Sequence, residues 1–135
     1  MAEWDSEQYL KFEAERTQPA VDLANRIELT APERILDLGC GPGNSTGVLA
    51  RRFPGAHILG VDNSENMIAT AQRDYPELEF RLFDATGPLS ELGGSFDVVY
   101  SNACIQWVPD HPALLRRMMD ILAPGGVMAV QIPNN

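Results

Sequence analysis

Short apolar segments alternate with helical segments along most of the chain, and this alternation limits the fold more than any other feature. Segments rich in Val, Ile and Leu predict strands at 34–38, 57–61, 78–83, 96–100 and 127–132. Helices are predicted between them at 44–53, 64–75 and 111–122. Such strands, separated by helices, are typical of a parallel sheet covered on both faces and joined by right-handed crossovers. We therefore predict an α/β fold with a doubly wound, Rossmann-like parallel sheet.

The alternation begins after about residue 30, which divides the chain into two parts. Residues 1–30 predict two helices, the second opened by Pro19, and we expect this helical segment to cover a ligand site on the 31–135 domain. Within that domain, Pro124-Gly125-Gly126 is expected to separate the last helix from the fifth strand. The fifth strand would be an exposed edge, and unpaired edges favour self-association.

Charge and hydropathy exclude several classes of function. The formal net charge is −9 at pH 7, which disfavours binding to nucleic acid or to an anionic membrane surface. No apolar run reaches the roughly 18 residues of a membrane span, and the first residues do not resemble a signal peptide. Cys40 and Cys104 are too far apart for a metal or redox motif. We predict a cytoplasmic protein without nucleic-acid or membrane partners.

A glycine-rich turn, Asp37-Leu38-Gly39-Cys40-Gly41-Pro42-Gly43, follows the first predicted strand. Glycine permits positive φ and has no Cβ, so a ligand can lie directly against the backbone. The helix that follows offers unpaired N–H groups at its start. Taken alone, the turn is also compatible with a tight connection that binds nothing.

Polar residues follow the next three strands. Asp62 ends the second strand, where this fold places an acid that accepts both ribose hydroxyls of a nucleoside. Asp84, followed by Ala85, can accept a hydrogen bond from an adenine amino group. Asn102 lies after the fourth strand, beside the glycine turn. Each residue alone could be a capping or solvated residue, but their order along one pattern indicates a nucleoside site.

The spacing of the glycines separates two classes of cofactor. Dinucleotide dehydrogenases favour G-x-G-x-x-G/A, with a small last residue beneath the pyrophosphate. Here that position is Asn44, and Gly43 comes one place earlier. S-adenosylmethionine carries no phosphate, so the turn need only admit its methionine and ribose parts. The pattern therefore favours methyl transfer over hydride transfer.

These motifs resemble those of class I S-adenosylmethionine-dependent methyltransferases, and the whole chain resembles the trans-aconitate methyltransferase family. The glycine turn and Asp62 specify only the superfamily, whereas Ala14-Glu15-Arg16 and Gln106-Trp107 are more specific matches. The resemblance implies S-adenosyl-L-methionine as cofactor and O-methylation of a carboxylate of a small tricarboxylic acid, trans-aconitate, to a methyl ester. Members of the family continue well beyond Pro133 with strands that complete the sheet.

The predicted site follows from the motifs and the resemblance together. The predicted cofactor-binding residues are Arg16, Asp37, Gly39, Cys40, Gly41, Asn44, Asp62, Asn63, Met67, Asp84, Ala85 and Asn102. The predicted acceptor-binding residues are Arg16, Gln106, Trp107 and His111. A carboxylate acceptor is already ionised at neutral pH, so we assign no catalytic acid, base or metal.

Three alternatives remain open at this point. The first is a methyltransferase for another small acceptor, such as an acyl-carrier thioester or a quinone precursor. The second is a nicotinamide-dependent oxidoreductase, which Asn44 disfavours. The third is a module that binds the cofactor without turnover.

Overall fold

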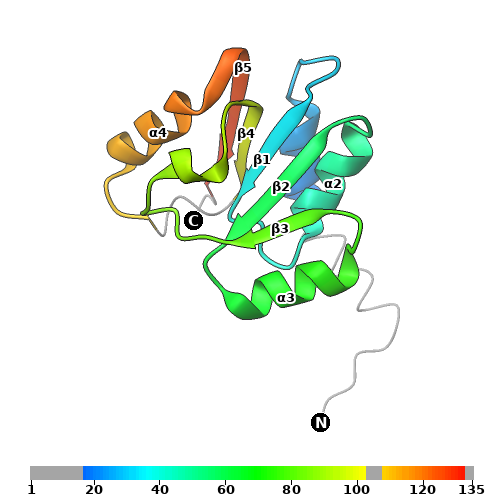
Figure 1. The fold of residues 1–135 in the computed structure, drawn as a ribbon. Helices are drawn as coiled ribbons and strands as arrows, with labels where there is room; N and C mark the ends of the chain where they lie inside the picture. Colours follow the sequence, from blue (N-terminus) through cyan, green and yellow to red (C-terminus); the bar gives the residue numbers. More distant parts are fainter. Residues whose placement is uncertain (1–16, 103–107, 133–135) are drawn as a thin grey trace.

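The computed structural model describes residues 17–102 and 108–132, which form one parallel sheet with helices on both faces (Figure 1). The strand order is β3-β2-β1-β4-β5. The strands are β1 Arg34–Leu38, β2 His57–Asp62, β3 Glu79–Leu82, β4 Phe96–Asn102 and β5 Leu122–Gln131. The order reverses direction between β1 and β4, and the predicted doubly wound α/β class is confirmed. In such sheets, ligands bind outside the carboxyl ends of the strands at this reversal.

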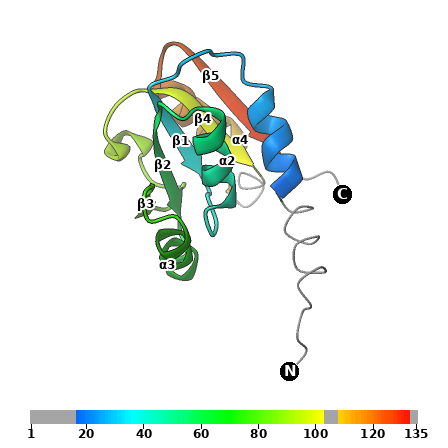
Figure 2. The same ribbon diagram turned by 90° about the vertical axis from the view of Figure 1, so that its right-hand side faces the viewer.

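The helices form two layers that enclose the sheet. They are α2 Asn44–Arg52, α3 Glu65–Asp74, α4 His111–Asp120 and the 3₁₀ helix η1 Leu89–Leu92, together with a helical segment over residues 17–25. Figure 2 shows α2 and the 17–25 segment on one face of the sheet, with α4 on the other. No helix in the described ranges is long and apolar enough to cross a membrane.

Neighbouring residues in each strand pack into different cores, as the period of two in a strand requires. Ile35 and Val98 face the core formed with α2 and the 17–25 segment. Leu36 and Val99 face the core formed with η1 and α4. Burial on both faces explains why the central strands are nearly continuous apolar runs rather than alternating ones.

The last strand begins earlier than the sequence predicts. We expected the helix to reach Leu122 and the strand to start at 127, but α4 ends at Asp120 and β5 starts at Leu122, which pairs with Phe96. Pro124-Gly125-Gly126 lies inside β5, where the register shifts. Within the described residues β5 pairs with β4 alone, and a strand paired on one side tolerates a proline without an N–H group.

Two smaller expectations also differ from the structure. Residues 17 and 18 are already helical, so Pro19 does not open that helix; its fixed φ is compatible with helical backbone. The 3₁₀ helix η1 was not predicted, because four residues are too few to show a helical period.

Candidate functional site

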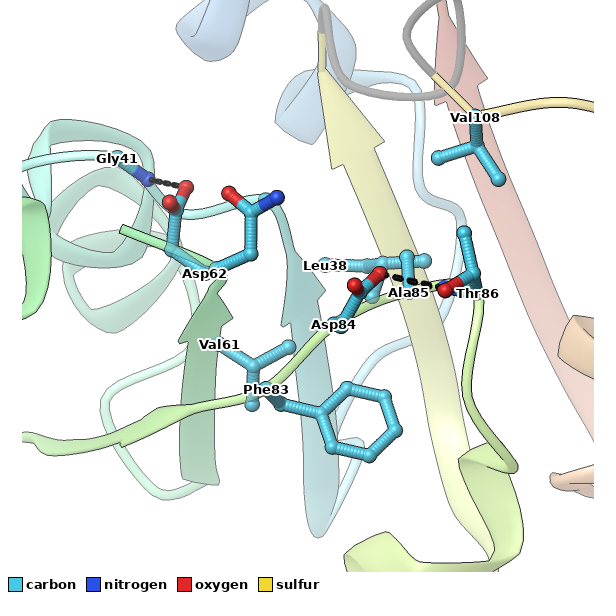
Figure 3. Close-up of a pocket in the computed structure, with 11 residues that line it drawn as sticks. Leu38, Gly41, Val61, Asp62, Phe83, Asp84, Ala85, Thr86 and Val108 are labelled. Atoms are coloured by element: carbon cyan, nitrogen blue, oxygen red, sulfur yellow. Dashed lines mark hydrogen bonds between the residues drawn. The ribbon is translucent and has the colours of Figure 1, made fainter. Parts of the chain in front are cut away.

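A cavity of about 570 Å³ opens at the carboxyl ends of β1, β2 and β3 (Figure 3). Its volume falls within the range of small-molecule and cofactor sites. The residues that line it are Leu38, Gly39, Gly41, Val61, Asp62, Asn63, Phe83, Asp84, Ala85, Thr86 and Val108. Six of the predicted cofactor-binding residues are on this wall, and they come from three different strand ends: Gly39, Gly41, Asp62, Asn63, Asp84 and Ala85.

The glycine turn follows β1 and is hydrogen-bonded to β2. The N–H groups of Gly39 and Cys40 both donate to the carbonyl oxygen of Val61, at 2.8 and 2.9 Å. Gly39, Gly41 and Gly43 have φ values of 82°, 56° and 100°, the left-handed region that favours glycine. A Cβ at Gly41 would have no atom within 4 Å, so this stretch of backbone is bare towards the cavity.

Asp62 connects the second strand to the glycine turn. Its Oδ2 accepts from the Gly41 N–H at 3.0 Å, and its Oδ1 accepts from the Ser64 N–H at 3.0 Å. Figure 3 shows the first of these bonds and places the Asp62 carboxylate beside the turn. Each carboxylate oxygen has two lone pairs, so both oxygens can accept one more hydrogen bond from a ligand.

Asp84 lies on the opposite side of the cavity, in a short loop after β3 (Figure 3). Its Oδ1 accepts from the N–H and the hydroxyl of Thr86, at 2.9 and 2.8 Å. The N–H and hydroxyl of Thr86 both lower the pKa of the exposed Asp84 carboxyl, so the side chain is a carboxylate at neutral pH. The next residue, Ala85, is buried, and its carbonyl oxygen accepts from Arg117 at 2.9 Å.

Asp37 is not on the cavity wall, although we predicted that it binds the cofactor. The side chain is fully buried, and its Oδ2 accepts from the hydroxyls of Ser45 and Thr46, each at 2.7 Å. Its Oδ1 has no hydrogen-bond partner among the described residues. Burial raises the pKa of Asp37 to about 6, the two hydroxyls oppose this shift, and the nearby Asp62 adds to it. In this structure Asp37 supports the start of α2 behind the turn.

The remaining predicted residues lie around the site or outside the described ranges. Cys40 is buried, Asn44 is half-buried and donates to the hydroxyl of Thr17 at 3.5 Å, and Met67 is 41% exposed on α3. Asn102 is half-buried at the end of β4, and His111 is half-buried at the start of α4. Arg16, Gln106 and Trp107 lie outside the described residues, and so does most of the 1–30 segment. These roles stay predictions.

Several wall residues and one supporting contact were not predicted from the sequence. The wall residues are Leu38, Val61, Phe83, Thr86 and Val108, and the contact is the bond from Arg117 to Ala85. Thr86 could have been found, because a threonine two residues after an aspartate often completes a hydrogen-bonded turn. Val108 and Arg117 carry no local signal, since only the tertiary fold brings them to this place.

The charge of the wall indicates which ligands it can hold. It carries two carboxylates, Asp62 and Asp84, and among the described residues no lysine or arginine lines it. The two carboxylates would repel a pyrophosphate, and no described cationic side chain on the wall offsets that charge. The same carboxylates would attract a sulfonium or an ammonium group. The wall therefore fits a nucleoside with a cationic substituent better than a dinucleotide.

A family model described as a methyltransferase domain matches residues 35–126, more than half of the chain. The chain belongs to this methyltransferase domain family. The matched residues include the glycine turn, Asp62 and the 83–86 loop, and thus most of the cavity wall.

Among curated proteins, the chain is similar to trans-aconitate 2-methyltransferases. It is 49% identical over 135 residues to the one from Methylobacterium radiotolerans and covers 51% of that protein. It is 50% identical over 135 residues to the one from Methylobacterium nodulans and covers 52% of it. In both comparisons the whole chain is matched. The chain thus spans about half the length of the curated relatives it matches.

Solved structures show the same fold. An amino pentose methyltransferase from Micromonospora echinaspora, solved with S-adenosylmethionine bound, is 25% identical with a TM-score of 0.78, and 99% of this chain covers 59% of that one. A phosphoethanolamine N-methyltransferase from Haemonchus contortus, in complex with S-adenosyl-L-methionine, is 28% identical with a TM-score of 0.72. There, 90% of this chain covers 32% of the other.

Proposed function

We propose that the cavity binds S-adenosyl-L-methionine, and that the protein methylates a carboxylate of a small tricarboxylic acid, trans-aconitate. The observation that carries the proposal is the placement of two carboxylates on opposite sides of one cavity, with a bare glycine backbone beside the first. The identity of about half to the curated trans-aconitate 2-methyltransferases supports the acceptor.

Asp62 would hold the ribose. Its two oxygens are fixed by the Gly41 and Ser64 N–H groups, and each retains a lone pair for one ribose hydroxyl. Because the protein has already oriented the carboxylate, little further ordering is needed when the ligand binds. Gly41 would let the methionine part approach the turn, since no side chain stands there.

Asp84 and Ala85 would hold the adenine. The hydrogen bonds from Thr86 occupy Oδ1 of Asp84, which leaves Oδ2 to accept from the adenine amino group. Leu38, Phe83 and Val108 supply apolar contact around the base. Asn63 and Met67, at and near the start of α3, would complete the ribose and adenine end.

The chemistry needs orientation more than it needs an acid or a base. When bound, the cofactor would supply a sulfonium methyl group, whose transfer to a carboxylate oxygen of the acceptor would form the O–C bond of the methyl ester as the S–C bond breaks, with S-adenosylhomocysteine as the leaving group. The acceptor is ionised before it binds, so no residue has to remove a proton. The role of this chain is to fix the donor and to exclude water from it.

The acceptor residues belong to the same proposal. Arg16, Gln106 and Trp107 would bind the carboxylates of the acceptor, and His111 would join them from the start of α4. Arg16 would instead hold the carboxylate of the methionine part if it lies closer to the donor. We also propose a cytoplasmic location, which agrees with a donor and an acceptor of metabolite size.

Two measurements test the proposal. Calorimetric titration with S-adenosylmethionine and S-adenosylhomocysteine should give saturable binding with one site per chain, whereas NAD should give no heat beyond dilution. Absence of binding to either adenosyl ligand would contradict the cofactor. Labelled methyl transfer to trans-aconitate, measured beside a thioester and a quinone precursor, tests the acceptor. Binding without transfer to any of them would favour the cofactor-binding module.

Self-association through β5 is a further part of the proposal. The described residues pair β5 on its β4 side only, so its outer backbone groups can pair with another strand. Sedimentation equilibrium of the 135-residue chain should then give a dimer at micromolar concentration. A monomer over the whole concentration range would contradict it.

A further inference from the structure

Arg117 connects α4 to the loop after β3, although the two segments are 32 residues apart in sequence. One terminal nitrogen of its guanidinium, Nη2, donates to the Ala85 carbonyl oxygen at 2.9 Å. Its Nε is buried and has no hydrogen-bond partner among the described residues. The side chain does not line the cavity, so its contribution to the site must pass through Ala85.

The Ala85 carbonyl and the Thr86 N–H belong to the same peptide unit. The described backbone contains no cis peptide bond, so these two groups point in opposite directions from one rigid plane. The carbonyl end accepts from Arg117, and the N–H end donates to Oδ1 of Asp84 at 2.9 Å. Arg117 and Asp84 therefore hold the two ends of a single planar group.

The two hydrogen bonds reinforce each other. A cationic donor on the carbonyl oxygen polarises the peptide and strengthens the N–H as a donor to the carboxylate. The Thr86 hydroxyl adds a second bond to the same oxygen of Asp84, at 2.8 Å. The side chain of Asp84 is exposed and accepts no other hydrogen bond from the described residues. Its orientation therefore depends on the peptide that Arg117 holds.

We infer that Arg117 is a positioning residue that sets base selectivity at the adenine end of the site. Through the 85–86 peptide it holds Asp84 so that Oδ2 accepts from the 6-amino group of a purine. A 6-oxo purine places an oxygen acceptor at that position, which a carboxylate repels. The inference rests on the proposed cofactor site and adds the residue that makes the site prefer adenine over hypoxanthine.

The test compares two ligands that differ only in the base: S-adenosylhomocysteine and S-inosylhomocysteine. Arg117→Met removes the charge and the donors but keeps an unbranched apolar chain, and Arg117→Lys keeps the charge. Arg116→Met is the matched control, because Arg116 is the exposed neighbour on the same helix. Calorimetry should show about a five- to tenfold loss of S-adenosylhomocysteine affinity in Arg117→Met, with less than about a twofold change for the inosine ligand.

Three comparisons distinguish positioning from general support. Arg117→Lys should recover part of the adenine preference, and Arg116→Met should leave it unchanged. When Asp84 is already alanine, Arg117→Met should cause no further loss, because the two residues act through one peptide. Equal losses for both ligands, or additive losses in the double variant, would overturn the inference and leave Arg117 as a packing residue of α4.

The amide proton of Thr86 gives a readout that needs no ligand. Loss of the Arg117 bond should weaken the hydrogen bond to Asp84 and move the Thr86 amide resonance upfield, with no such change in Arg116→Met. An unchanged resonance in Arg117→Met would overturn the inference. If the parent chain bound neither nucleoside ligand, the proposed cofactor would fail, and the Thr86 resonance would still test the contact.

Discussion

The two sides of the cavity are built differently. The glycine-turn side, residues 38–41 and 61–63, is joined by hydrogen bonds between neighbouring strands, with Gly39 and Cys40 bound to Val61 and Gly41 bound to Asp62. The loop side, residues 83–86, is hydrogen-bonded to β2 through the Phe83 N–H, which donates to the Asp62 carbonyl oxygen at 2.9 Å, but its carboxylate is held by bonds within three residues. The support that the loop receives from α4 is one bond to Ala85.

This difference indicates which part of the site is rigid before a ligand binds. The glycine-turn side inherits the rigidity of β1 and β2 at the centre of the sheet. The loop side follows β3 at one edge of the sheet, and beyond the Phe83 bond to β2 it depends on a helix that is distant in sequence. We therefore expect changes on the first side to remove binding and changes on the second side to alter selectivity.

The largest effect should come from Asp62→Ala. This change removes the acceptor for the ribose and also releases Gly41 and Ser64, so S-adenosylhomocysteine affinity should fall by about 100-fold or more. Asp62 is half-buried, and the fold should survive. Calorimetry measures the loss of affinity, and circular dichroism measures whether the fold is kept. Asp74→Ala, at an exposed position on α3, serves as control. If Asp62→Ala bound the ligand as tightly as this control, the role assigned to Asp62 would be contradicted.

Two neighbouring glycines of the turn should respond in different ways. Gly41→Ala places a methyl group in open cavity space at a φ of 56°, so it should cost about 1–2 kcal/mol of stability and roughly tenfold or more in ligand affinity. Gly43→Ala would bring Cβ to 2.8 Å from the Tyr75 ring at a φ of 100°, and its main effect should be on stability.

Denaturant unfolding and calorimetry on the same preparations separate these two effects. Gly55→Ala is the control, since a Cβ there meets nothing within 4 Å and the backbone is not left-handed. If Gly41→Ala bound the ligand as tightly as this control, the ligand would not lie against the turn.

The smallest effect concerns pH and the buried Asp37. Its pKa of about 6 in the folded state is above that of the unfolded chain, so the folded state holds the proton more tightly. The resulting stability is gained as the pH falls below about 6 and lost as the pH rises through that value. Between pH 7 and pH 5 this group should add about 1 kcal/mol to the free energy of unfolding, a gain that Asp37→Asn lacks.

Urea unfolding of the parent and the variant at both pH values measures the difference. Asp120→Asn, an exposed change at the end of α4, is the control for replacing an aspartate by an asparagine. If the free energy of unfolding changed with pH equally in Asp37→Asn and in the parent, burial would not raise the pKa of the Asp37 carboxyl.

The sequence predicted the sheet well, because local composition determines strands that are buried on both faces. The segment 34–38 and the helix start at Asn44 were placed correctly, and the start of the helix predicted at 64 coincides with Ser64, whose hydroxyl accepts from the Met67 N–H at 3.3 Å. The start of β5 was wrong, because Pro124-Gly125-Gly126 suggests a break, whereas an edge strand absorbs it as an irregularity.

The site was predicted in part, and the limit has a physical cause. Asp37 and Asp62 both end or nearly end apolar strands, and no local signal separates them. One side chain points into the protein towards Ser45 and Thr46, and the other points into the cavity. Arg117 could not be found, because its bond to Ala85 exists only after α4 has packed on the sheet.

The most direct test is a crystal structure of this chain with S-adenosylhomocysteine. Both ribose hydroxyls should lie within hydrogen-bonding distance of the Asp62 carboxylate, the ligand should lie against the backbone of Gly41, and the adenine amino group should lie beside Asp84. Ligand density elsewhere on the molecule, with both carboxylates unengaged at saturating concentration, would contradict this binding mode.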